Sequence, residues 1–270
     1  KYEPEVVRTA PEEISVYGPD KEQVIIGYRW PGCRSDEYFT QLMVDAILSN
    51  GTAGLINLNL VMTQKVLRAE AGLDENTDYN VYELIANPRE GQKLEECRDL
   101  LLQQIEKLKN GEFDENMLSA IIANMKVDDM KRLESNQGRA YAMENMFVHN
   151  VNPSAFVSRY QIMGRLTKQD IINFAKTHFT NDYTVVYKRL GEDKTTKKVV
   201  KPAITPVSIN RVDQSTFLKN INAMTVSELK PDFIQFDRAI QKDKMTNGTP
   251  YWYIKNNDNQ LFNLYYLFDM

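Results

Sequence analysis

This sequence of 270 residues contains only two histidines, the side chains that most often hold a catalytic zinc ion. The two histidines, His149 and His178, are far apart, and neither has a second ligand at the spacing of one helical turn. A catalytic zinc site needs three protein ligands and one open position. His178 falls in the last turn of an expected helix, where a partly positive imidazole complements the helix dipole. We therefore expect both histidines to be structural or exposed, and we expect no catalytic residue, metal or other cofactor in this chain.

The other reactive residue types do not form catalytic patterns either. The sequence has no Gly-x-Ser-x-Gly motif, which would mark a serine nucleophile. Adjacent carboxylates, as in Glu95-Glu96 and Asp128-Asp129, point in different directions on a helix and are typical of solvated faces. Cys33 and Cys97 belong to no Cys-x-x-Cys motif, so they predict neither a disulfide framework nor a zinc knuckle.

A stretch of small residues between two expected helices is the candidate binding segment. It comprises Ser49, Asn50, Gly51, Thr52, Ala53 and Gly54. Small residues let another backbone approach closely. The same composition is also typical of an ordinary turn between helices with a glycine at the helix end. The residues alone leave both interpretations open.

The composition excludes several classes of partner. A net charge of −4 and an isoelectric point near 5.4 lack the basic surface that nucleic-acid phosphates require. The one basic run has no interleaved aromatic residues and is typical of a solvated loop; it contains Lys194, Lys197, Lys198 and Lys201. No stretch approaches the roughly 18 to 20 apolar residues that span a bilayer. We expect no nucleic-acid partner and no membrane insertion.

The first half of the sequence predicts two strands, then two helices, then a third strand. Residues 13–18 and 22–30 are expected to form a strand pair joined by the turn at 19–21. Ser35 is the expected N-cap of a helix with one apolar face, which ends at Asn50-Gly51. A second helix is predicted over 55–69, followed by a strand over 78–87.

Helices dominate the expected second half. They cover 95–110 and about 113–150, with Asp114 as an N-cap, and a third begins at Thr167 with Asp170 at capping-box spacing. A strand over 183–187, a helix near 212–218 and a final hairpin turning at 256–259 complete the prediction. This order predicts an α+β two-layer sandwich, a mostly antiparallel sheet covered on one face by helices.

The two ends of the sequence are typical of a segment of a longer protein. The chain begins with a lysine in a charged stretch with two prolines, and it stops inside an expected strand. We therefore expect a linker over 1–12, a main domain over 13–207, a linker over 208–244, and the opening hairpin of a truncated following domain over 245–270.

Four segments together resemble the second domain of peptidases of the pitrilysin/insulinase family. They are EQVIIGYRWPG, DEYFTQLMVDAILSNGTAGLINLNLVMTQ, LTKQDIINFAKTHFTNDYTVVYKRLG and KMTNGTPYWYIKNN. The resemblance spans residues 13–207 and 245–268 and lies in the order and spacing of the segments. It implies a clamshell of four similar α+β domains, in which the first domain holds zinc through an inverted His-x-x-Glu-His motif and a downstream glutamate. That motif is absent from this sequence.

The resemblance implies a non-catalytic part of a zinc endopeptidase. This part would form a wall of the substrate chamber and would contact the peptide substrate. Zinc would be a cofactor of the parent protein, and the remaining domains of that protein and a peptide or unfolded polypeptide would be the partners. In some relatives a strand edge beside a glycine-containing turn holds the N-terminal part of the substrate. The matching turn is Ser49 to Gly54, in which Asn50 and Thr52 depart from the commoner pattern.

Two other functions fit the same sequence. One is an inactive paralogue that acts as a scaffold or peptide-binding subunit, since the family includes such proteins. The other is an unrelated α+β interaction domain, which cleavage at 196–206 into two stably folded parts would favour. The compartment does not follow from the residues; the habits of the family suggest the bacterial periplasm or cell envelope.

Overall fold

The chain forms two compact units, Lys1–Thr195 and Thr196–Met270. The structure is a computed structural model that describes residues 6, 8–193, 200–228, 230, 231, 233 and 235–269. Half of the expected N-terminal linker 1–12 and three lysines of the basic run, Lys194, Lys197 and Lys198, lie outside the described residues. The domain limits expected from the sequence stay a prediction.

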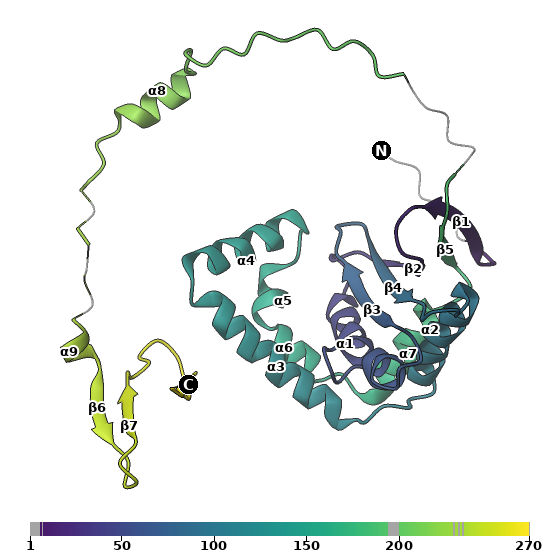
Figure 1. Cartoon of the computed structure of the whole chain (residues 1–270), viewed down its shortest axis with the longest axis horizontal. Helices are drawn as coiled ribbons and strands as arrows, with labels where there is room; N and C mark the ends of the chain where they lie inside the picture. The colour runs from purple at the N-terminus through teal and green to yellow at the C-terminus, as the bar shows by residue number, and fades with distance from the viewer. Residues whose placement is uncertain are drawn as a thin grey trace. The chain divides into compact units, whose positions relative to one another are not determined.

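A five-stranded sheet is the framework of the first unit (Figure 1). Its strands lie in the order β1-β5-β2-β4-β3. Only β1 and β5 are parallel, and the other three neighbouring pairs are antiparallel, so the expected mostly antiparallel sheet is confirmed. In chain order the strands are β1 (Glu12–Gly18), β2 (Gln23–Pro31), β3 (Arg68–Asp74), β4 (Tyr79–Asn87) and β5 (Tyr183–Leu190).

The expected pairing of the first two strands is wrong, although both strands exist. β5 lies between them, parallel to β1 and antiparallel to β2. The physical reason is burial. β5 places Val185 and Tyr187 in the core, as a central strand requires, whereas every residue of β1 except Gly18 is exposed. The exposed strand therefore takes the edge of the sheet.

The predicted helix over 55–69 is also wrong beyond Val61. A short π-helix, η1 (Asn57–Val61), follows Leu55 and Ile56, and the chain then turns at Gln64, where φ is +55°. Residues Arg68–Asp74 form strand β3, which pairs with β4. Pairing with a buried neighbour outweighs the weak strand propensity of a segment rich in alanine.

Helices cover one face of the sheet, as expected. α1 (Tyr38–Leu48), α2 (Leu94–Lys109) and α7 (Lys168–His178) contact the strands (Figure 1). The capping box at the start of α7 is confirmed, since Thr167 and Asp170 satisfy each other's backbone amides. The expected caps Ser35 and Asp114 instead lie before their helices, where each side chain accepts a hydrogen bond from the amide two residues ahead.

The long helix predicted over 113–150 is divided. α3 (Asn116–Leu133) ends before Ser135, whose side chain accepts a hydrogen bond of 2.9 Å from the amide of Gly138 and caps α4 (Asn136–Val148). A serine in this position competes with the helical hydrogen-bond pattern and starts a new helix. Two short helices, α5 (Pro153–Val157) and α6 (Arg159–Met163), return the chain toward α7.

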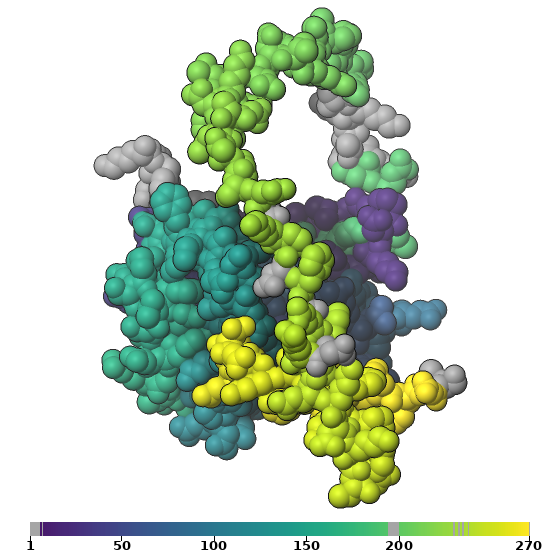
Figure 2. Space-filling view, turned by 90° about the vertical axis from the view of Figure 1, so that its left-hand side faces the viewer, coloured from purple at the N-terminus to yellow at the C-terminus, as the bar shows by residue number. Residues whose placement is uncertain are grey.

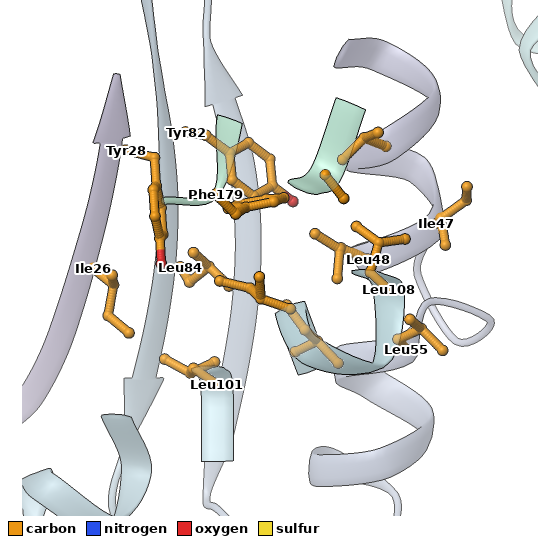
Figure 3. Packing of buried hydrophobic residues seen from close by; sticks show 14 of the residues in the cluster. Ile26, Tyr28, Ile47, Leu48, Leu55, Tyr82, Leu84, Leu101, Leu108 and Phe179 are labelled. Atoms are coloured by element: carbon orange, nitrogen blue, oxygen red, sulfur yellow. The ribbon is translucent and has the colours of Figure 1, made fainter. Parts of the chain in front are cut away.

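The core lies between the sheet and this helical layer. Alternate residues of β2 and β4 are buried, and Figure 3 shows Ile26, Tyr28 and Leu84 facing side chains of the helices. The ring of Trp30 stacks on Tyr82 with centroids 4.3 Å apart. The opposite face of the sheet carries partly exposed residues. The expected two-layer α+β architecture is confirmed.

The second unit is short and largely exposed. Its elements are α8 (Thr216–Ala223), α9 (Phe236–Ala239), β6 (Gln241–Lys244) and β7 (Pro250–Tyr253). The helix predicted near 212–218 begins later, after the N-cap Ser215. The hairpin turns at Asn247-Gly248 and not at 256–259, because Gly248 adopts a φ of +86° that favours glycine. Residues 261–269 form no strand.

Candidate functional site

The small-residue stretch forms a tight turn at the end of α1. Ser49 caps the helix, and its amide donates to the carbonyl of Asp45 at 2.7 Å. The carbonyl of Asn50 accepts from the amide of Ala53 at 2.8 Å, which closes the turn. Gly51 and Thr52 lie exposed at its tip, whereas Gly54 is buried at its base. The sequence-predicted residues are thus neighbours in one turn, but they do not share one surface.

The two glycines of this turn have different roles. Gly51 adopts a φ of +48°, where a side chain would be strained, although space around it is open. At Gly54 a Cβ atom would lie 2.5 Å from the amide nitrogen of Asn50 and 2.7 Å from the carbonyl oxygen of Leu48. Gly54 therefore lets the chain fold back on itself. Its buried position makes it a structural residue of the turn and not a contact surface.

The turn lies beside the free edge of the sheet. β3 is the last strand in the sheet order, and the Ser49 hydroxyl oxygen accepts a hydrogen bond of 3.5 Å from the amide of Ala71. That amide therefore points away from β4. Because outward amides alternate along an edge strand, the amides of Ala69 and Leu73 point the same way. This edge offers main-chain donors to an extended chain that approaches it.

A shallow depression opens on the uncovered face of the sheet next to this edge. It has a volume of about 320 Å³ and is lined by residues of β3 and β4. Gly72 lines the depression, and a Cβ atom there would meet no atom within 4 Å. The charged residues that line it are all acidic: Glu70, Asp74 and Glu83. Arg68 pairs with Glu70 at 2.7 Å from outside the depression. The site combines free backbone amides with an acidic surface.

Our prediction from the sequence missed this acidic group because it ended a helix at 69 and expected no strand over 70–74, the segment that supplies Glu70 and Asp74. The segment Arg68–Asp74 nevertheless carries a signal for a strand. Charged residues at 68, 70 and 74 alternate with Ala69, Ala71 and Leu73, and this period of two is typical of a half-buried strand. The strand register then sets Gly72 opposite Glu83, which brings acidic residues of two strands onto one face.

A buried carboxyl group lies one helical turn before the candidate turn. Burial raises the pKa of Asp45 to about 7. The buried Tyr82 side chain interacts with this carboxyl group and acts to lower the pKa of Asp45, but the loss of hydration outweighs it. Below about pH 7 the folded chain therefore favours the protonated form of Asp45, because an ionised carboxylate loses its hydration there.

The described residues do not fit a zinc site. The two histidines belong to different elements, since His149 follows α4 and His178 ends α7. The ring of His178 lies 3.1 Å from a carboxylate oxygen of Glu37 and packs on Phe174. Within the described part of the chain, no three His, Cys, Asp or Glu side chains are grouped as a metal site would require. Cys33 and Cys97 are buried free thiols, and burial raises the pKa of each to about 11.

Comparison with solved structures identifies the fold. A protease from Helicobacter pylori aligns with a TM-score of 0.65 and 22% identity over 70% of this chain. The inactive domain of an M16 peptidase from Pseudomonas fluorescens aligns with a TM-score of 0.59 and 15% identity, also over 70% of this chain. The first half of the periplasmic protease PqqL from Escherichia coli gives a TM-score of 0.53 and 12% identity over the same share. This chain has the fold of an M16 peptidase domain.

The M16 fold confirms, at the level of architecture, the resemblance to pitrilysin/insulinase peptidases that the sequence indicated. The aligned part of this chain covers 46%, 45% and 44% of those three proteins, so it spans less than half of their length. A scan against protein-family models and a search among curated proteins find no match. No helix in the described ranges is long and apolar enough to cross a membrane.

Proposed function

We propose that this chain is a non-catalytic part of a zinc metallopeptidase of the pitrilysin/insulinase type, and that it holds extended peptide substrates. The proposal assigns zinc and the catalytic residues to another part of the parent protein, because the described residues of this chain do not fit a zinc site. The chain would form part of the wall of a substrate chamber and would bind the substrate there. Its partners would be the remaining domains of the parent protein and an unfolded polypeptide.

One observation carries this proposal: the free edge of β3 beside the turn from Ser49 to Gly54. A polypeptide in extended form can add a strand to such an edge through main-chain hydrogen bonds. The strand carries small residues, Ala69, Ala71 and Gly72, which allow a second backbone to come close. The contact is independent of most substrate side chains, as a peptidase that accepts many sequences requires.

The acidic depression adds a preference for one end of the peptide. Glu70, Asp74 and Glu83 line it on the same face of the sheet. An N-terminal ammonium group placed there is attracted by three carboxylates, one of which already pairs with Arg68. We therefore propose that the N-terminal part of the substrate lies along β3 with its free amine in the depression.

The proposed compartment is the bacterial periplasm or cell envelope. The support is the structural similarity to the periplasmic protease PqqL. The alternative function is that of an inactive scaffold or peptide-binding subunit. In that case β3 would still bind the peptide, but the parent protein would have no zinc site. Reading the gene upstream of Lys1 for a His-x-x-Glu-His motif, together with zinc analysis of the intact parent, distinguishes the two.

The variant Gly72→Val tests the peptide site. Gly72 has space for a side chain, and valine suits a strand, so the folded chain should keep its thermal stability. The added isopropyl group fills the depression and should weaken binding of an unstructured fluorescent peptide with a free N-terminus at least about tenfold, a loss of about 1.4 kcal/mol. Fluorescence anisotropy measures this affinity.

Gly27→Val is the matched control. Gly27 lies in β2 on the same face and in the same row of the sheet, since Glu83 pairs with both glycines. It also has open space for a Cβ atom but does not line the depression. This variant should bind the peptide like the unmodified chain. Equal affinity in all three proteins, or an equal loss in both variants, would contradict the proposed site.

A further inference from the structure

The helical layer contains a cavity that shares no lining residue with the depression at β3. It has a volume of about 270 Å³ and is enclosed by α1, α3, α4, α5, α6 and the loop after β3. α4 forms one wall although only Gly138 and Ala142 of this helix are buried. On the outer side of the wall, Met143 and Phe147 are 66% and 86% exposed. Figure 2 shows this helical surface in teal.

The floor of the cavity is apolar and rich in sulfur. Met125, Met146 and Met163 come from three different helices, and Tyr38 and Phe39 come from α1. Thioether side chains adapt to irregular shapes and make favourable contacts with aromatic rings. A floor of this kind accepts an aromatic or aliphatic group without a specific hydrogen-bond pattern.

A hydrogen-bonded network fixes the charge on one side of the cavity. Both Arg132 and Arg159 bond to the carboxylate of Asp129, and the Tyr160 hydroxyl donates to it as well. The guanidinium of Arg159 also lies over the rings of Phe156 and Tyr160, at 4.0 and 4.5 Å from their centroids. The two cations of the cavity are therefore held by one carboxylate.

Two further carboxylates line the cavity without such a partner. Glu75 accepts a hydrogen bond of 2.5 Å from the Tyr38 hydroxyl, and Asp128 is exposed at the rim. Neither forms an ion pair with a residue in the described ranges of the chain. The lining thus has three acidic side chains, two arginines and His149, and the acidic pair Glu75 and Asp128 lies outside the Asp129 network.

We propose that this cavity binds a hydrophobic cation, an aromatic or aliphatic group that carries an ammonium. The apolar body would lie against the methionines and the rings of Tyr38 and Phe39. The ammonium would lie toward Glu75 and Asp128, where two carboxylates attract it and an aromatic face stabilises it further. This site is separate from the β3 edge, and the proposal does not depend on the proposed peptidase function.

The test compares three probes of nearly the same shape on the full chain at pH 7. They are 2-phenylethylamine, 2-phenylethanol and phenylacetate, which differ in charge at one end. Methyl NMR of 13C-labelled methionine reports binding, because Met125, Met146 and Met163 line the cavity. The buried Met43 and the exposed Met62 are internal controls. We expect the amine to bind best and the carboxylate at least about fivefold more weakly than the amine.

Variants locate the charge preference. Asp128→Asn and Glu75→Gln should each reduce the ratio of amine to carboxylate affinity while the alcohol binds unchanged. Glu144→Gln, on α4 and exposed but outside the cavity lining, should leave all three affinities unchanged. Equal binding of the three probes would overturn the proposal, as would shifts of Met62 as large as those of the lining methionines. Wild-type ratios in both cavity variants would also overturn it.

Discussion

The Ser49 hydroxyl group accepts a hydrogen bond from the Ala71 amide and so joins the end of α1 to the free edge of the sheet. This amide would otherwise have no partner within the sheet, since it points away from β4. The bond is long, at 3.5 Å, and its acceptor is a single rotatable side chain. In the proposed peptide complex, a peptide carbonyl could therefore replace Ser49 at this amide at little cost.

The variant Ser49→Ala should release the amide of Ala71 without unfolding the domain. Loss of one long hydrogen bond should lower the free energy of unfolding by about 0.5 kcal/mol. Amide hydrogen exchange at Ala71 should accelerate, because the group becomes accessible to water. Thr52→Ala, at the exposed tip of the same turn, is the control and should change neither quantity. Unchanged exchange at Ala71 in Ser49→Ala would show that the contact is not formed in solution.

The two glycines of the turn should respond differently to alanine. Gly54→Ala brings a Cβ atom within 3 Å of backbone atoms of Leu48, Ser49 and Asn50, so the turn must shift. We expect a loss of about 2 to 4 kcal/mol, as for overpacked or strained buried positions. Gly51→Ala meets open space and has only the cost of a positive φ, about 1 to 2 kcal/mol. Urea denaturation measures both values, and the reverse order would contradict the structure of the turn.

Elements with strong local signals could be predicted from the sequence. The strand β4 and the helices α2 and α7 have clear periodicity and end signals, and Thr167 with Asp170 specifies the start of α7 directly. The strand order could not be predicted in the same way. The position of β5 between β1 and β2 depends on which strands are buried and which are exposed. That comparison involves all strands of the sheet.

The candidate site was predictable only in part. Ser49 to Gly54 are consecutive, so their small size is visible in the sequence. The acidic group requires residues of two strands, and Glu83 meets Gly72 only through the register of β3 with β4. A one-residue change of register would place Glu83 beside a core position. The charge of the depression therefore follows from pairing that no local pattern specifies.

The Asp129 network should stabilise the domain at neutral pH and weaken in acid. Burial acts to raise the pKa of Asp129, but the bonds from Tyr160 and Arg159 outweigh it and hold that pKa below its usual value. A depressed pKa means that the stabilisation is present above pH 4 and is lost as pH falls through the folded-state pKa.

Asp129→Asn tests this network. It should destabilise the chain by about 2 to 3 kcal/mol at pH 7, because Arg132 and Arg159 lose their shared charge partner. The difference from the unmodified chain should shrink at pH 3. Asp128→Asn, the exposed neighbour, should have little effect at either pH. Urea titrations at the two pH values measure the difference, and an equal loss at both would contradict the ionic role.

Asp45 should give the opposite pH dependence. Burial raises its folded-state pKa to about 7, whereas the unfolded chain has a pKa of about 3.9. Between these values the folded chain holds a proton that the unfolded chain has released, so stability falls as pH rises from about 4 to about 7 and is constant above. The full shift corresponds to a loss of at most about 4 kcal/mol over this range.

The variant Asp45→Asn removes the titration and should flatten the dependence of stability on pH. Asp36→Asn, an exposed control just before α1, should keep that dependence. A wild-type profile that stays flat between pH 4 and 7 would show that Asp45 is ionised and hydrated in the folded chain.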